Sequence, residues 1–267
     1  MFTTYLKTLS DAQVLTLLPL IACSFLLITT LLLSYFRGIL GLTEYDPDVI
    51  DTATQNTMSG AYVVLGFVLV LAMTTVSDLD SSVSQEATAI KSIERLLVLD
   101  GSKQALQSRE YLLSYTESLI QDEWPDLKDG HGNTRTSSEL KKLFLSLDAF
   151  NPKSPKETIL YDRIINQTDK AAELRNARIL NVQSNLPETF YLVSVFSLLG
   201  VIVIAALRLI EATPMRTIAL TIQIAMLTLM LSAIVIIDLP YLGETVSTPE
   251  AVQNALTSMQ SRNLLNH

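Results

Sequence analysis

Small and hydroxylated residues recur at three- and four-residue spacing through an apolar stretch of the chain, Met58–Ser77. In an α-helix this spacing places them along one side. Such a face either packs closely against another helix or lines water. We take its members, together with the one large side chain at its border, as candidate pore-lining residues: Ser59, Val63, Gly66, Phe67, Val70, Thr74 and Ser77.

Carboxylates stand at both ends of this stretch. Asp78 and Asp80 follow it directly, and Glu44, Asp46 and Asp48 lie in the acidic segment before it. Clustered charge of one sign raises the local concentration of counter-ions, and rings of Asp or Glu at a pore mouth favour cations. The five side chains are therefore candidate charge-selectivity residues. The alternative is an ordinary solvated helix start for the first pair and a solvated turn for the other three.

Other site chemistry has little support in the sequence. The single cysteine, Cys23, lies in an apolar run, where it serves as a small apolar filler, and no disulfide framework or CxxC motif is present. His131 and His267 have no second ligand at a metal-site spacing. The acidic residues of segment 78–188 are expected on solvated helix faces. We therefore predict no metal, no cofactor and no catalytic residue.

Four uncharged runs of 18 or more residues account for a composition that is 49% hydrophobic. Runs of this length are the sequence criterion for a membrane-spanning helix, so the lipid bilayer is an expected partner. The first run is too long for a secretory signal and lacks a small-residue cleavage site. The predicted spans are Val14–Phe36, Met58–Ser77, Phe190–Leu207 and Thr217–Ile237.

An even number of spans places both termini and the long segment 78–188 on one side of the membrane. The positive-inside rule compares the Lys and Arg residues near the two membrane surfaces. Five lie on the side of the termini and three on the other, which predicts cytoplasmic termini. The five are Lys7, Lys91, Arg95, Arg175 and Arg178, and the three are Arg37, Arg208 and Arg216.

Segment 78–189 carries helical periodicity outside the membrane runs. Ala105, Leu112 and Leu119 are spaced seven residues apart, as in helices that pack on helices. The segment holds 18 acidic and 14 basic residues, which argues against a nucleic-acid surface. The predicted helix boundaries in this segment are a break at Asp100-Gly101-Ser102, a helix end at Trp124-Pro125 and a capping box at Thr136 and Glu139 that starts the next helix. A further helix is predicted from Ser154-Pro155 to about Leu186.

Together these patterns predict an all-α membrane protein with a helical bundle inserted between the second and third spans. We expect an N-terminal hairpin over 1–77, a cytoplasmic bundle over 78–189, a C-terminal hairpin over 190–239 and a cytoplasmic tail over 240–267. Residues 36–57 are expected to form an acidic loop. A carboxylate and a proline at Asp238-Leu-Pro240 are expected to fix a tight turn, and Thr248-Pro249-Glu250 to start a final helix.

Three stretches resemble the bacterial bestrophin-like domain family. They are the helix after the second span, Gln85–Ile90, the approach to the third span, Leu174–Ile179 with Leu186-Pro187, and the exit from the fourth span, Asp238–Pro249. Their order and spacing match over roughly Met58 to Met259. The resemblance implies an oligomeric channel of the bacterial inner membrane with a cytosolic helical body and a pore lined by the second span. It also implies five subunits, although the periodicity does not exclude four.

The sequence departs from bestrophins in two respects. Bestrophins carry consecutive acidic residues after the fourth span that bind calcium, whereas Gly243-Glu244-Thr245 has a single carboxylate, so calcium gating is not expected. Most animal bestrophins conduct anions, whereas the acidic residues around the second span and a net charge of −8 favour a cation such as potassium.

Three functional hypotheses follow. The first is a homo-oligomeric ion channel that conducts cations. The second is a membrane-anchored signalling or scaffold protein without conduction, although the chain carries no obvious effector module. An enzyme is disfavoured because the spans hold no charged residue and no acid, base and nucleophile converge in the sequence.

Overall fold

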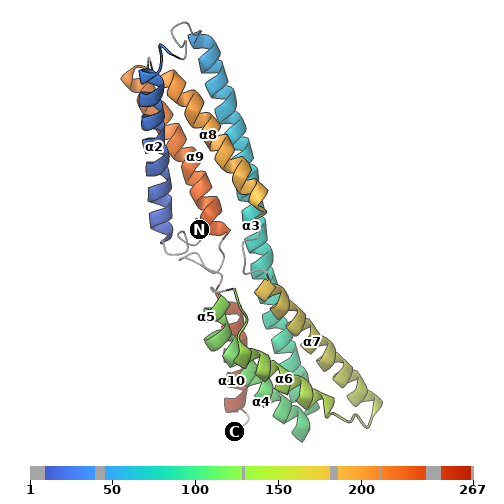
Figure 1. Cartoon of the computed structure of the whole chain (residues 1–267). Coiled ribbons are helices and arrows are strands. Elements are labelled where there is room, and N and C mark those ends of the chain that lie inside the picture. The colour runs from blue at the N-terminus through green and yellow to red at the C-terminus, as the bar shows by residue number, and fades with distance from the viewer. Residues whose placement is uncertain are drawn as a thin grey trace. The chain divides into compact units, whose positions relative to one another are not determined.

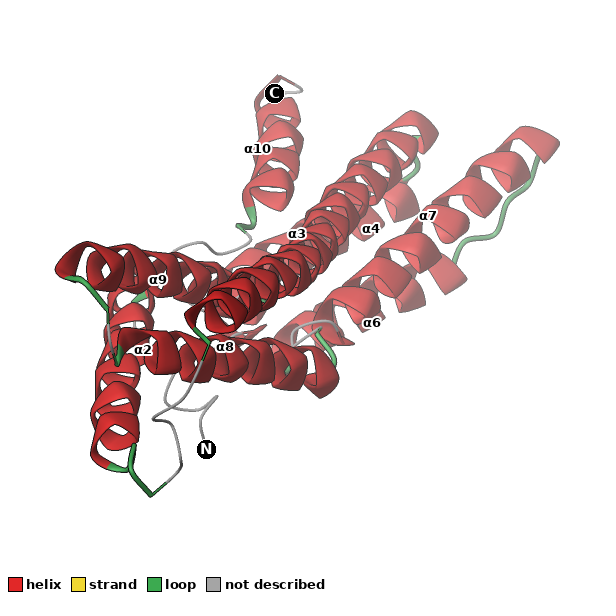
Figure 2. Ribbon diagram, turned by 90° about the horizontal axis from the view of Figure 1, so that it is seen from above, coloured by secondary structure: helices red, strands yellow, loops and turns green. Residues whose placement is uncertain are grey.

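The computed structural model describes residues 10–39, 46–127, 130–180, 186–210, 212–238 and 248–265. Within these ranges all regular elements are helices, which confirms the all-α prediction (Figure 2). The chain divides into two compact units. The membrane unit comprises Met1–Thr75 and Ser184–Thr245, and the bundle unit comprises Val76–Gln183 and Val246–His267.

Within the described ranges, four helices are long and apolar enough to cross a membrane, as the sequence predicted: α2 (Asp11–Tyr35), α3 (Pro47–Asp100), α8 (Glu188–Leu209) and α9 (Pro214–Ile237). In the membrane unit, α2, α8 and α9 lie together with the first part of α3 (Figure 1). Local signals set the helix ends. Ser10 and Gln13 form a capping box before α2, and Thr213 caps α9, where Pro214 takes the first helical position.

Helix α3 is continuous over 54 residues, so the second span and the helix that follows it form one element. It begins at Pro47, however, so residues 47–57 are helical rather than part of a loop. The Asp46 carboxylate accepts a hydrogen bond of 2.9 Å from the backbone N–H of Asp48 at this start. The prediction was wrong here because the absence of charge identifies only the part of a helix that lies in lipid, and α3 extends beyond that part.

One side of α3 supplies the core of the membrane unit. Its buried residues recur at helical spacing and pack with apolar side chains of α8 and α9. They are Met58, Ala61, Leu65, Val68 and Ala72. The hydroxyl of Tyr62 also donates a hydrogen bond of 3.4 Å to the backbone oxygen of Gln223 in α9.

Asp238 joins the end of α9 to the start of α8. This carboxylate is only 4% exposed, and it accepts hydrogen bonds from the backbone N–H of Leu186, at 2.9 Å, and from the hydroxyl of Tyr191. The predicted role of Asp238 in a local turn is therefore only part of its function, because its carboxylate also accepts hydrogen bonds from residues about fifty positions earlier in the chain. Pro240 and the rest of that motif to residue 247 lie outside the described residues.

The bundle unit contains the second part of α3 together with α4 (Lys103–Ser118), η1 (Leu119–Glu123), α5 (Trp124–Asp126), α6 (Thr134–Asp148), α7 (Pro155–Leu180) and α10 (Glu250–Leu265). Buried apolar residues from α3, α4, α6, α7 and α10 form one core. The tail helix α10 belongs to this core through Val252, Ala255 and Met259.

Two of the predicted helix boundaries in the bundle unit are confirmed. The break at Asp100-Gly101-Ser102 separates α3 from α4, with Gly101 at a positive φ of 66°, a conformation that favours glycine. Ser154 caps α7, since its hydroxyl accepts from the backbone N–H of Glu157 at 3.2 Å. α7 ends at Leu180, before the predicted end at Leu186, and residues 181–185 lie outside the described ranges.

Two other boundaries were predicted wrongly. The chain continues through Trp124-Pro125 because the π-helical turn η1 bonds the N–H of Trp124 to the oxygen of Leu119, which accommodates the proline in the first turn of α5. Helix α6 starts at Thr134, not after Thr136. The side-chain Oδ1 of Asn133 accepts from the backbone N–H of Arg135, at 2.8 Å, and of Thr136, at 3.4 Å, so Asn133 is the cap.

Replacing Asn133 with alanine removes this cap and also a 2.6 Å hydrogen bond from its amide to Asp126. We expect Asn133→Ala to lower the stability of the bundle by about 1 to 2 kcal/mol. The measurement is the apparent midpoint of thermal unfolding in detergent. Lys141→Ala, on the exposed side of the same helix, is the control. Equal midpoints for the two variants would contradict the assignment of the cap.

Candidate functional site

The predicted pore-lining residues of the membrane unit lie on the side of α3 that the other helices of the chain leave uncovered. Val63 is 59% exposed, Phe67 71% and Val70 62%. Ser59 and Thr74 are also exposed, and Gly66 is partly exposed. The opposite side of α3 is the buried side described above. The structure thus brings the predicted residues together on one open face, about 22 Å long from Ser59 to Thr74 at about 1.5 Å per residue.

Two threonine hydroxyl groups on and beside this face are satisfied within the helix. Thr74 donates to the backbone oxygen of Val70, and Thr75 donates to that of Leu71. A hydroxyl whose proton is used in this way presents only its oxygen lone pairs to an outside partner. Thr74 and Thr75 are therefore available as acceptors.

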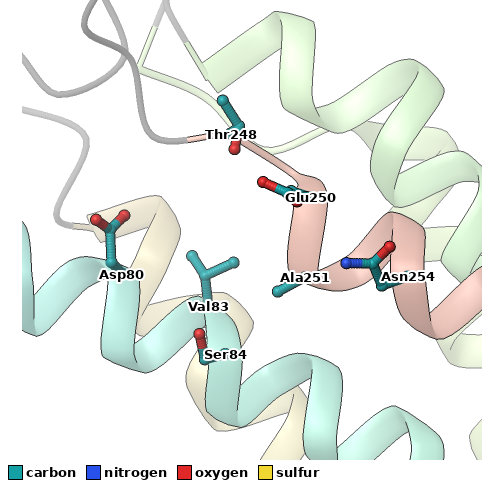
Figure 3. A pocket seen from close by; sticks show the side chains of 7 residues that line it. All are labelled: Asp80, Val83, Ser84, Thr248, Glu250, Ala251 and Asn254. Atoms are coloured by element: carbon teal, nitrogen blue, oxygen red, sulfur yellow. The ribbon is translucent and has the colours of Figure 1, made fainter.

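In the bundle unit, Ser77, Asp78 and Asp80 are exposed along the second part of α3. Asp80 also lines a cavity of about 340 Å³ between α3 and α10 (Figure 3). Glu250 of α10 lies across this cavity, which is otherwise lined by Val83, Ser84, Thr248, Ala251 and Asn254. Two carboxylates therefore line one small space.

The acidic segment before the second span carries two of the predicted charge-selectivity residues within the described ranges. Asp46 and Asp48 are exposed, and Glu44 lies outside the described residues. Asp51, a further acid of this segment, pairs with Arg208 at the end of α8 and with Arg216 near the start of α9. These ion pairs could not be predicted from local sequence because both partners lie more than 150 residues further along the chain.

A network of buried charges connects three helical elements of the bundle unit. Arg178 of α7 donates to Glu86 of α3 at 3.0 and 3.3 Å and to Glu123 of η1 at 2.9 Å. Arg175 donates to both oxygens of Glu123 from Nε, each at 3.0 Å, and to the hydroxyl of Ser137 in α6 at 2.9 Å. All four charged side chains are at least nine-tenths buried. Two acids and two bases thus neutralise each other away from water.

Aromatic side chains complete this network. The Arg178 guanidinium lies 4.9 Å from the ring centroid of Trp124, a favourable cation–π contact. Burial opposes the charged form of Arg178, but the charges of Glu86 and Glu123 outweigh it and raise the arginine pKa. Burial and the neighbouring Glu86 charge raise the pKa of the Tyr115 hydroxyl well above its usual range, so Tyr115 stays neutral.

A second buried carboxylate of α3 holds the tail helix. Glu94 accepts from Arg109 of α4 at 3.0 Å and pairs with Arg262 of α10 at 2.7 Å. Arg109 also donates to the backbone oxygen of Met259 at 2.9 Å. α10 is therefore fixed to α3 and α4 by charge as well as by apolar packing.

These buried charges were not predicted from the sequence. The acids of segment 78–188 were expected on solvated faces, which is wrong for Glu86, Glu94 and Glu123. Arg175 and Arg178 were counted among the cations near the membrane surface, whereas both are buried and paired. For Glu86, burial was indicated by its position on the helix. It shares one helical face with the apolar residues Ile90, Ile93 and Leu97.

In the described part of the chain, no three His, Cys, Asp or Glu side chains lie close enough together to hold a metal ion. Cys23 is partly buried within α2. His131 lies in the turn before α6, and His267 lies outside the described residues. The arrangement is therefore that of an uncovered helix face flanked by carboxylates.

Comparisons with known proteins agree with this architecture. A family model described as the Bestrophin-like domain matches residues 20–252, which confirms the resemblance seen in the sequence. A crystal structure of a membrane protein superposes with a TM-score of 0.66 at 11% sequence identity, and the match covers 92% of this chain and 98% of that chain. This likeness establishes a shared fold. No curated protein matches the chain.

The buried network yields a stability prediction. Glu123→Gln removes one negative charge and leaves Arg175 and Arg178 with a single buried carboxylate between them. Breaking one partner of a buried ion pair costs about 3 to 5 kcal/mol, so we expect a large fall in the apparent unfolding midpoint in detergent. Glu110→Gln, at an exposed position of α4, is the control. A midpoint as high as that of the control would mean that the network contributes little.

Proposed function

The chain belongs to the Bestrophin-like domain family, and from this membership we propose that it forms an oligomeric, cation-conducting ion channel in a membrane. The family is known for channels rather than enzymes. The observation that carries the proposal is the uncovered side of α3, where small, hydroxylated and apolar residues alternate while the opposite side is buried. We take this face as the pore lining.

The preference for cations rests on local charge. Asp78 and Asp80 are exposed just beyond the apolar part of α3, and Glu250 adds a second carboxylate to the cavity beside Asp80. In an oligomer, the same carboxylates recur in every subunit and together form a ring, which strengthens the negative field at a pore mouth. Asp46 and Asp48, with Glu44, supply a similar field before the second span. Potassium is the first ion to test.

A pore needs several copies of α3, since one helix cannot enclose water. The resemblance to bestrophins supports five subunits, and a tetramer is the alternative. The narrowest part of the pore would be set by Val63, Phe67 and Val70, the largest exposed side chains on the face. We place the protein in the bacterial inner membrane with the bundle unit and the termini in the cytoplasm.

A scaffold without conduction is the second candidate, and one observation favours it. Val63, Phe67 and Val70 are as apolar as the residues of an ordinary helix-packing face, so the same side of α3 is also suited to contact with another membrane helix. The two functions differ in their response to a larger side chain on this face of α3. Added volume blocks a pore, whereas it disrupts a packed interface.

Gly66→Leu tests the pore lining. A Cβ atom added at Gly66 meets nothing within 4 Å among the described residues beyond the helix's own backbone, so the variant is expected to fold. We expect the ion current through the purified protein in planar bilayers to fall about tenfold or more because leucine narrows the pore. Gly200→Leu in α8, where the space is equally open, is the matched control and keeps its current. Loss of the oligomer with Gly66→Leu would favour the scaffold instead.

Selectivity is read from the reversal potential under a potassium chloride gradient. We expect a value near the potassium equilibrium potential for the unmodified protein. The double variant Asp78→Asn and Asp80→Asn shifts it towards zero because two carboxylates are lost from each subunit. Asp162→Asn, at an exposed position of α7, leaves it unchanged. A reversal potential near that of chloride in the unmodified protein would contradict cation conduction.

A further inference from the structure

The membrane unit contains a cavity of about 470 Å³ where α3 begins, α8 ends and α9 begins. Its charged residues are Asp51, Arg208 and Arg216. Towards the middle of the helices the lining becomes uncharged and partly apolar, with Met58 and Tyr62 of α3 and Leu220 of α9. The cavity therefore has a charged end and a less polar end. Thr54, Gln55, Ser59, Ala219 and Gln223 complete its walls.

The charged end carries a net charge of +1. Arg208 is only 5% exposed and uses Nε and Nη2 to hold Asp51. Arg216 reaches the same carboxylate with Nη2 at 3.2 Å, and its side chain is 49% exposed. Among the described residues that line the cavity, Asp51 is the one carboxylate against two arginines. Arg216 thus retains guanidinium donors for a further anionic group.

The position along the helices places this cavity at the boundary between headgroups and acyl chains. Arg208 directly follows the uncharged run that ends at Leu207, and Arg216 directly precedes the run that begins at Thr217. Beside the cavity on α9, the apolar side chains of Ile218 and Ile222 are more than half exposed. Exposed apolar surface at this depth is covered by acyl chains.

From this arrangement we infer that the cavity binds the phosphate group of an anionic phospholipid. Arginine matches phosphate geometry with two parallel N–H donors, and a partly buried guanidinium binds phosphate more strongly than one in water. Arg216 supplies the donors, and Arg208 with Asp51 fixes its position. A phospholipid fits both ends of the site because its acyl chain extends from the phosphate along Met58, Tyr62 and Leu220 to the exposed Ile218 and Ile222 beside the cavity. A soluble anion would use the charged end alone.

This inference does not depend on conduction. Ser59 is the one residue of the cavity wall that also belongs to the proposed pore face. Asp51, Arg208 and Arg216, on which the inference rests, lie outside the proposed pore and selectivity residues, and binding is measured without any flux. Failure of the channel proposal would leave the lipid site standing, and failure of the lipid site would leave the channel proposal standing.

The test is lipid binding to the purified full-length protein in detergent, counted by native mass spectrometry. Phosphatidylglycerol and phosphatidylcholine with the same acyl chains are titrated in parallel. We expect phosphatidylglycerol to bind about tenfold more tightly, and Arg216→Gln to remove most of that preference because one charge-assisted contact is lost. Arg37→Gln is the control. Both arginines lie next to a predicted span, Arg37 just after the first and Arg216 just before the fourth. Arg37, however, does not line the cavity.

Three results would overturn the inference. Equal losses from Arg216→Gln and Arg37→Gln would mean that any cation at the membrane surface attracts anionic lipid. Displacement of phosphatidylglycerol by millimolar inorganic phosphate would identify a soluble anion as the occupant. Equal binding of the two lipids to the unmodified protein would exclude recognition of lipid charge. Retained preference in Arg37→Gln together with its loss in Arg216→Gln would support the site.

Discussion

The buried ion pairs of Glu86 and Glu94 are the interactions on which the bundle unit depends. Both carboxylates belong to α3, and together they bind arginines from α4, α7 and α10. Removing such charges from water is costly, and only near-complete pairing offsets that cost. Such pairing is present in the network of Glu86, Glu123, Arg175 and Arg178, where every charged side chain makes at least one hydrogen bond. The core of this bundle consists mainly of Leu, Ile and Ala. Apart from the buried ion pairs, such a core has few features that distinguish one helix register from the next.

In the membrane unit, α3 is covered on one side only. Its buried side, which includes Ala61, Leu65 and Ala72, packs with α8 and α9, whereas the described residues leave the side with Val63, Phe67 and Val70 exposed. In a membrane such a face meets lipid, another subunit or water. Membership of a channel family and the carboxylates beyond the apolar stretch both favour water, which is why we propose a pore. Lipid contact is instead assigned to the outer surfaces of the membrane unit and to the cavity at Arg216.

Much of the fold could be predicted from the sequence because its signals are local. Eighteen uncharged residues suffice to predict a span, and Ser154 with Pro155 and Glu157 suffices to predict the start of α7. Local signals also misled where two of them compete. Thr136 looked like a cap, but Asn133 lies three residues earlier and takes that role. The helical start of α3 at Pro47 was missed because charge ended the predicted span at Met58.

The candidate site was predictable to a smaller extent. Spacing alone placed Ser59, Gly66, Val70 and Thr74 on one face, but it could not decide whether that face was covered. Long-range pairing was not predictable. Asp51 meets Arg208, and Glu86 meets Arg178 across 92 positions, and no periodicity in a single sequence encodes such partners. Function is less accessible still, since an uncovered apolar and hydroxylated face suits both a pore and a packed interface.

Water access to α3 is the measurement that separates these possibilities most directly. With Cys23 replaced by serine, single cysteines are introduced along α3 in the assembled protein and exposed to a membrane-impermeant, water-soluble thiol reagent. If α3 lines the pore, cysteines at Val63, Gly66, Val70 and Thr74 react, whereas those at Ala61, Leu65 and Val68 do not. Protection of the first set from the aqueous reagent, with labelling by a lipid-soluble one, would contradict a pore at this face.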